Sequence, residues 1–168
     1  MRTRLLTREI WLPRPVPEVF AFFSDPANLE AITPPWLRFH ILTPQPLEMK
    51  AGTLLDYRLR LHGIPIYWRT EISVWEPPHR FVDQQLKGPY LLWVHEHTFE
   101  EKDDGTLVRD RVDYRSPGWI LEPLIERWLV RPDLDRIFDY RAERLREFLG
   151  HRQPLAATAA AESLRLVK

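Results

Sequence analysis

The first part of the chain has the pattern of one strand followed by two short helices. Residues 5–12 follow a strand pattern that ends at Pro13, since repeated prolines cannot continue a sheet ladder. The apolar residues that follow Pro17 fit a short helix that stops near Ser24. Asn28 can cap a second short helix, which Pro34 closes. We therefore expect one strand and then two short helices.

Residues 36–114 predict an antiparallel meander of six strands, because short alternating segments are separated by glycine, proline and aspartate breakers. In one segment, leucines and a tyrosine at 55, 57, 59 and 61 alternate with charged residues, which is typical of a strand with one dry face. The next segment alternates in the same way, and its apolar face carries Ile66, Trp68, Thr70, Ile72 and Val74.

After Pro117 the apolar period becomes helical, with a stripe at Leu134, Ile137, Phe138, Leu145, Phe148 and Leu149. We expect Pro132 to kink this region or to separate a preliminary turn from a main helix that starts near Asp133 and stops at Gly150. The order of elements predicts an α+β fold in which a curved sheet of about seven strands wraps around the long C-terminal helix. Residues 1–150 then form one domain, and residues 151–168 are a low-complexity tail.

The amino-acid composition excludes several classes of protein and of functional site. The 168 residues suit one domain, and 24 basic against 24 acidic residues give no basic excess for nucleic-acid binding. The absence of cysteine excludes disulfides, iron–sulfur clusters and cysteine nucleophiles. The sequence has no signal-peptide run, no apolar stretch long enough for a membrane span, and no phosphate-loop, dinucleotide or nucleophile-elbow motif. We expect a cytoplasmic protein.

Several segments resemble the SRPBCC superfamily, the START-like proteins of the helix-grip type. They are the run from Val16 to Leu29, then Ile32-Thr33-Pro34, Gly52-Thr53 and Phe138-Asp139-Tyr140-Arg141. The run from Gly88 to Tyr114 is similar to uncharacterised bacterial ligand-binding SRPBCC proteins. The resemblance covers residues 3–149 and implies a helix-grip fold with a hydrophobic pocket beneath the long helix. The superfamily includes lipid carriers, polyketide cyclases, coenzyme Q-binding proteins and chaperone activators, so the fold does not decide among functions.

The pattern Trp93-x-His95-x-His97-x-Phe99 places four side chains on one strand face, and its aromatic ends indicate that this face points inward. On the following strand Asp110 lies on the apolar face. A four-residue loop, Lys102–Gly105, sets His97 opposite Asp110, whereas a two-residue loop, Asp104-Gly105, makes them diagonal neighbours. Either register lets an imidazole reach the carboxylate, which a buried aspartate requires.

Arg141 is the candidate cation for the same group, because it lies on the helix stripe that faces the sheet. These residues have three interpretations: a network that fixes strand register, the polar end of a ligand pocket, or a metal site in which Asp110 joins the two histidines. His40, His62 and His79 have no ligand-like spacing, and we expect no zinc or iron and no other cofactor.

We expect the domain to bind a hydrophobic or aromatic small molecule between the sheet and the long helix. The predicted ligand-binding residues share the inward faces; they are Tyr57, Leu59, Trp68, Trp93, His95, His97, Asp110, Tyr114, Ile137 and Arg141. One alternative is a polyketide cyclase or dehydratase with His95, His97 or Asp110 as acid and base. The other is a protein-interaction module, in which Trp68, Trp93 and Trp128 would fill a residual cavity.

Overall fold

The computed structural model describes residues 2–151 as one antiparallel sheet covered by helices. Seven strands pair in the order β1-β7-β6-β5-β4-β3-β2. Their bounds are β1 (Arg4–Leu12), β2 (His40–Ile41), β3 (Leu54–Leu61), β4 (Ile64–Glu76), β5 (Arg80–Lys87), β6 (Leu92–Lys102) and β7 (Gly105–Arg115). From β2 to β7 each strand pairs with the next along the chain, as expected of a meander, and β1 closes onto β7. Apart from residue 151, the predicted tail lies outside the described residues.

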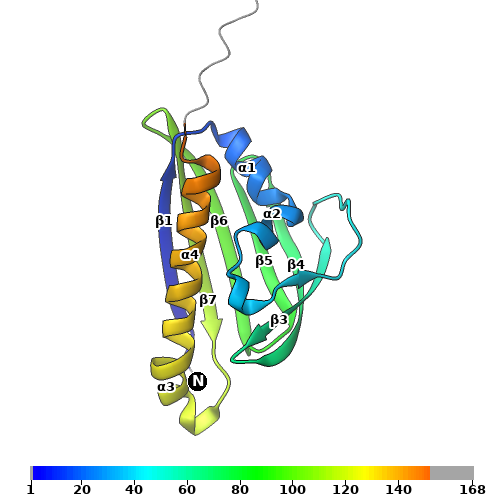
Figure 1. Cartoon of the computed structure of the whole chain (residues 1–168), viewed down its shortest axis with the longest axis vertical. Helices are drawn as coiled ribbons and strands as arrows, with labels where there is room; N and C mark the ends of the chain where they lie inside the picture. The colour runs from blue at the N-terminus through cyan, green and yellow to red at the C-terminus, as the bar shows by residue number, and fades with distance from the viewer. Residues whose placement is uncertain (1, 152–168) are drawn as a thin grey trace, which may run out of the picture.

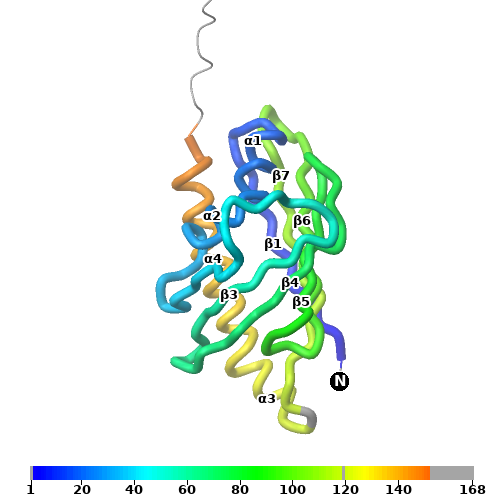
Figure 2. The backbone as a smooth tube through the Cα atoms, turned by 90° about the vertical axis from the view of Figure 1, so that its right-hand side faces the viewer, coloured from blue at the N-terminus to red at the C-terminus, as the bar shows by residue number. Residues whose placement is uncertain are grey.

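The helices lie in two groups. After β1 come α1 (Val16–Ser24), α2 (Pro26–Ala31) and a 3₁₀ turn, η1 (Pro35–Leu37). After β7 come η2 (Trp119–Leu121), α3 (Glu122–Ile125), a π-type turn η3 (Glu126–Val130) and the long α4 (Arg131–Leu149). Figure 1 shows α4 running along the sheet, with α1 and α2 across one end of it. Figure 2 shows α2 and α4 on the same side of the sheet. The predicted helix-grip α+β fold is confirmed, and no helix among residues 2–151 is both long and apolar enough to cross a bilayer.

Three local predictions need correction. The cap of α2 is Asp25, whose carboxylate accepts a hydrogen bond from the Ala27 amide, whereas Asn28 donates to the carbonyl of Phe22. Pro132 does not interrupt the helix, because it sits in the first turn of α4, where a missing N–H costs little. In β4 the pairing register shifts between Ile72 and Val74. The shift brings Trp75, rather than the predicted Val74, against the core.

The buried apolar residues form two clusters between the sheet and the helices. The first surrounds Phe20 and includes Ile10, Phe99, Val108 and Leu145. The second surrounds Trp68 and includes Leu6, Trp93, Val112 and Phe138. Every predicted stripe residue of α4 packs inward except Phe148, which is 42% exposed. Between these clusters, β6 and β7 contribute His95, His97 and Asp110 as buried polar side chains.

Candidate functional site

The β6–β7 hairpin sets the positions of three polar side chains. Asp103 and Asp104 form its two-residue turn, and both have positive φ angles of 49° and 56°, the conformation that suits the twist of a hairpin. Lys102 therefore pairs with Gly105, and the register continues until His97 lies directly opposite Asp110. This is the register expected for the loop Lys102–Gly105. The predicted contact between the histidines and Asp110 follows from it.

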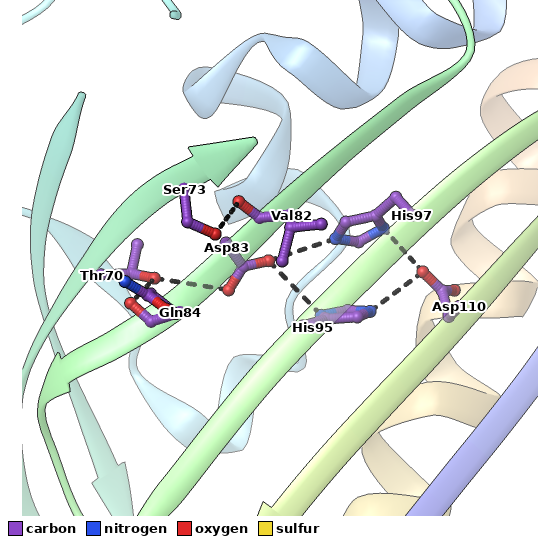
Figure 3. A network of polar contacts seen from close by, with 8 residues as sticks. All are labelled: Thr70, Ser73, Val82, Asp83, Gln84, His95, His97 and Asp110. Carbon is purple, nitrogen blue, oxygen red and sulfur yellow. Dashed lines mark hydrogen bonds and ion pairs between the residues drawn. The ribbon is translucent and has the colours of Figure 1, made fainter. Parts of the chain in front are cut away.

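Strand β5 adds a carboxylate, Asp83, that is not among the residues predicted from the sequence. Asp83 pairs with His95 across β5 and β6, and Phe81 pairs with His97. Figure 3 shows Asp83 on one side of the two imidazoles and Asp110 on the other. Thr70 on β4 extends the row, since its hydroxyl lies 3.4 Å from Oδ1 of Asp83 and donates to the Gln84 carbonyl at 2.9 Å. Thr70, Asp83, His95, His97 and Asp110 thus form a polar band across four strands.

Both imidazoles bridge the two carboxylates. Nε2 of His95 is 3.0 Å and Nδ1 of His97 is 2.7 Å from the same oxygen, Oδ1 of Asp110. The His95 contact has hydrogen-bond geometry; the His97 contact is an ion-pair distance without that alignment. On the other side, Nε2 of His97 lies 3.3 Å and Nδ1 of His95 lies 3.6 Å from Oδ2 of Asp83. Each ring therefore presents one nitrogen to each carboxylate.

The charges within the band favour two ionised carboxylates. Burial opposes ionisation of Asp110, but the charge of His97 and the hydrogen bond from His95 outweigh it and lower the pKa of Asp110. Burial likewise opposes ionisation of Asp83, yet the hydrogen bond from His97 and the charges of His95, His97 and Arg141 lower the pKa of Asp83. Burial also acts against the charged form of His97, but both aspartates raise the pKa of His97 above its ordinary value. Burial and the charge of His97 lower the pKa of His95. The two aspartates therefore favour the charged form of His97, whereas burial and the charge of His97 favour the neutral form of His95.

The band opens onto a cavity of about 170 Å³ between the sheet and α4. Apolar side chains from β3, β4, α2 and α4 form most of its wall, and Asp83, His95, His97, Thr70 and Arg141 are among its polar lining groups. The sequence predicts that the polar groups lie at one end of the pocket. The strand register instead places them with Trp68 and Trp93 on one side and with Ile72 and Phe81 on the other.

Eight of the ten predicted ligand-binding residues line this cavity: Tyr57, Leu59, Trp68, Trp93, His95, His97, Ile137 and Arg141. Asp110 does not, because the two histidines lie between it and Asp83. Tyr114 does not line it either. The hydroxyl of Tyr114, a fully buried residue, donates to Oε1 of Glu126 at 2.6 Å, and Ser116 donates to the other oxygen of Glu126 at 2.7 Å.

Arg141 faces inward as predicted but has a different neighbour. Its guanidinium lies over the Phe138 ring, 5.3 Å from the ring centre, and its charge acts on Asp83 rather than forming an ion pair with Asp110. Its Nε atom is buried and has no hydrogen-bond partner within residues 2–151. A buried donor of this kind favours an anionic or hydrogen-bonding group in the cavity.

The arrangement expected for an interaction module is not the one observed. Trp68 and Trp93 form part of the cavity wall, with ring centres 5.4 Å apart, and leave the cavity open. Trp128, the third predicted filler, is 72% exposed because it lies on the outward side of η3. Within the described residues the cavity therefore remains open, and both polar and apolar side chains line it.

One subset of the band has the composition of a metal site. Asp83, His95 and His97 each turn one ligand atom toward the other two, and these atoms all lie within 4.8 Å of one another. Two imidazoles and a carboxylate are ligands that zinc and other divalent transition metals accept.

Comparisons with known proteins support the family and the fold. The profile of the family described as "Polyketide cyclase / dehydrase and lipid transport" matches residues 12–136. No curated protein matches the chain significantly by sequence. Among solved structures, protein Ms6760 from Mycobacterium smegmatis superposes with a TM-score of 0.65 at 17% identity, over 88% of this chain and 96% of that one.

Two further solved structures have the same fold. The ZhuI aromatase/cyclase from a Streptomyces species gives a TM-score of 0.62 at 16% identity, covering 88% of this chain and 96% of its own. A major latex-like protein from Panax ginseng gives 0.64 at 15% identity, covering 90% and 99%. These identities establish a common fold only. Together with the family match they confirm the resemblance to SRPBCC proteins.

Proposed function

Because this chain belongs to the polyketide cyclase, dehydrase and lipid transport family, we propose that its cavity binds a small, mainly apolar molecule that carries an acidic or hydrogen-bonding group. The single observation behind the proposal is the cavity itself, whose wall is largely aromatic and aliphatic but contains the polar band and Arg141. Apolar walls supply affinity, and a few fixed polar groups orient the ligand.

Cavity size limits the class of ligand. A protein cavity of about 150 Å³ holds one benzene molecule, and the cavity found here is about 170 Å³. One substituted aromatic ring therefore fits, whereas a sterol or a polycyclic polyketide needs the cavity to widen. The buried Nε of Arg141 favours a carboxylate or phenolic oxygen on that ring.

Thermal unfolding in a chelator-containing buffer tests the proposal. The panel contains single-ring aromatic acids, their uncharged analogues, fatty acids, quinones, sterols and aromatic polyketides. A ligand at a hundred times its Kd adds about 2.7 kcal/mol to the free energy of unfolding, which raises Tm by roughly 5–10 °C in a domain of this size. We expect the small aromatic acids to produce the largest rise.

Two matched pairs of variants locate the binding site. Leu59→Trp fills the cavity from β3 and should abolish the rise, whereas Leu54→Trp, on the exposed side of the same strand, should retain it. Arg141→Leu should reduce the rise for acids more than for uncharged analogues, and Arg146→Leu on the exposed face of α4 should not. No shift with any compound, or a shift that Leu59→Trp leaves intact, would contradict the proposal.

An enzymatic role for the same cavity is favoured by one observation, the direct access of His95 and His97 to its interior. Such imidazoles, each beside a carboxylate, can exchange protons with a bound molecule. The binding experiment separates the two functions. A binder recovered unchanged after long incubation supports carriage, and its conversion to a product detected by mass spectrometry supports the cyclase or dehydratase alternative.

A further inference from the structure

We infer that Asp83, His95 and His97 bind a divalent transition-metal ion, with Asp110 behind them as a carboxylate that both imidazoles contact. The inference is independent of the proposed organic ligand. It also departs from the expectation of no zinc or iron, which rested on the lack of a further histidine with ligand-like spacing. Strand β5 supplies that ligand through the pairing of Asp83 with His95.

The spacing of the three ligand atoms suits an ion. Zinc binds imidazole nitrogen and carboxylate oxygen at about 2.0–2.2 Å in tetrahedral geometry, which separates neighbouring ligand atoms by about 3.3–3.6 Å. Oδ2 of Asp83 lies 3.3 Å from Nε2 of His97 and 3.6 Å from Nδ1 of His95. Two edges of the coordination polyhedron are therefore already in place, and the third pair of atoms lies within 4.8 Å.

The outer carboxylate fixes the tautomer of His95. Nε2 of His95 donates to Oδ1 of Asp110 at 3.0 Å, so Nδ1 of a neutral His95 turns its lone pair toward Oδ2 of Asp83. Nε2 of His97 has hydrogen-bond geometry to the same oxygen of Asp83 at 3.3 Å, and an ion bound there would take the place of the hydrogen between them. Metal-bound histidines commonly donate their second N–H to a carboxylate, as His95 does to Asp110.

Oδ2 of Asp83 faces two imidazole nitrogens, and a single hydrogen bond does not serve both. The hydrogen bond between Nε2 of His97 and Oδ2 of Asp83 leaves Nδ1 of His95 facing the same oxygen at 3.6 Å. A divalent ion would bind all three atoms together. All three residues line the cavity, so the ion would keep coordination positions open to the interior, as metal sites with three protein ligands do.

Arg141 allows metal binding to be distinguished from the binding of an acidic organic ligand. Arg141 and Asp83 line the same cavity, and the charge of Arg141, which acts on Asp83, would repel a dication bound there. Removing this charge in Arg141→Leu should therefore tighten metal binding severalfold, while the same variant weakens the binding of acidic organic ligands. The two proposals thus predict opposite effects of one substitution.

Equilibrium dialysis of the full chain against Zn²⁺ and Co²⁺, after chelator treatment and removal of the chelator, provides the test. We expect one equivalent per chain by elemental analysis and a visible Co²⁺ spectrum of four- or five-coordinate type. Asp83→Asn should abolish stoichiometric binding, and Asp110→Asn should weaken it about 10–100-fold. Asp113→Asn, on the outer side of β7, is the matched control and should bind as wild type does.

Circular dichroism of each variant shows whether it is folded. If Asp83→Asn does not fold, the wild-type Co²⁺ spectrum and the tightening in Arg141→Leu still decide the question. Folded wild-type protein that takes up no stoichiometric zinc or cobalt overturns the inference. Binding that survives unchanged in both Asp83→Asn and Asp110→Asn overturns it equally, because the ion must then lie elsewhere. Neither result bears on the thermal-shift experiment, which is performed with chelator present.

Discussion

Two tyrosines show how burial changes the contribution that one kind of hydrogen bond makes to stability. Tyr114 donates to Glu126 at 2.6 Å inside the protein, whereas Tyr67 donates to Asp56 at 2.7 Å on the outer face of the sheet. Burial and then Glu126 raise the pKa of Tyr114 to about 12, so its hydroxyl remains a donor at neutral pH. Glu126 is itself buried, and losing a donor leaves its carboxylate less compensated.

We therefore expect Tyr114→Phe to lower the free energy of unfolding by about 1–3 kcal/mol, measured by urea denaturation. Tyr67→Phe also removes a hydroxyl that donates to a carboxylate. The carboxylate of Asp56, however, also accepts hydrogen bonds from Arg69 and is accessible to solvent. The effect of Tyr67→Phe should be clearly smaller. Equal losses in the two variants would show that burial of Glu126 does not govern the cost.

Individual residues also explain why the sequence reveals only part of the site. The alternation of Trp93, His95, His97 and Phe99 is visible because apolar residues enclose the histidines on one face. Asp83 lies in a segment, Arg80–Lys87, where Phe81 and Val82 are both buried although they point to opposite faces. No alternation marks the inward face there, and Asp83 looks like part of a solvated polar run. Only the observed pairing of β5 with β6 assigns it to the cavity.

Elements were easier to predict than their junctions. Strand periods and helix stripes depend on local order, so the meander and α4 follow from the sequence. The bulge in β4, the cap of α2 and the π-type turn before α4 depend on contacts with other parts of the fold. The pocket around Glu126 depends on β1 as well, since Arg4 donates to Glu122 at 2.9 Å and lies 3.8 Å from Glu126. Residues 118 or more positions apart cannot be paired by local pattern.

The β6–β7 turn offers a test at the scale of an element. Asp104 has a φ of 56°, a conformation that glycine adopts at lower cost than other residues. Asp104→Gly should stabilise the protein by about 0.5 kcal/mol. Glu101→Gly, the same type of change three residues earlier within β6, should instead destabilise it by about 0.5–1 kcal/mol. Chemical denaturation of both variants checks the two signs, and destabilisation by Asp104→Gly would contradict the assigned turn.

At the scale of the whole molecule, the polar band divides the apolar interior into two clusters. On β7 the order is Val108, Asp110 and Val112, and the two valines belong to different clusters. On α4, Leu145 belongs to one cluster and Phe138 to the other, with Arg141 between them. Buried charges of this kind are not an efficient source of stability. Because these polar residues lie beside a cavity, a functional reason for their position between the two apolar clusters is favoured.

Both apolar clusters of the described residues lie within the chain up to the C-terminal end of α4. The two clusters are built from residues between Leu6 and Leu149, and the amide of Gly150 closes α4 by donating to the carbonyl of Arg146 at 2.8 Å. A chain that ends at His151 keeps all of these contacts. Because changes away from packed contacts usually alter stability by no more than about 0.5 kcal/mol, its Tm should match that of the full chain within about 2 °C.

The ligand-induced rise in Tm should also be unchanged in the chain that ends at His151, since the residues that line the cavity lie between Phe22 and Arg141. Differential scanning calorimetry of the two chains, with and without an aromatic acid, measures both quantities. A drop in Tm of more than about 5 °C, well beyond what a neutral deletion gives, would place part of the domain's stability after residue 151.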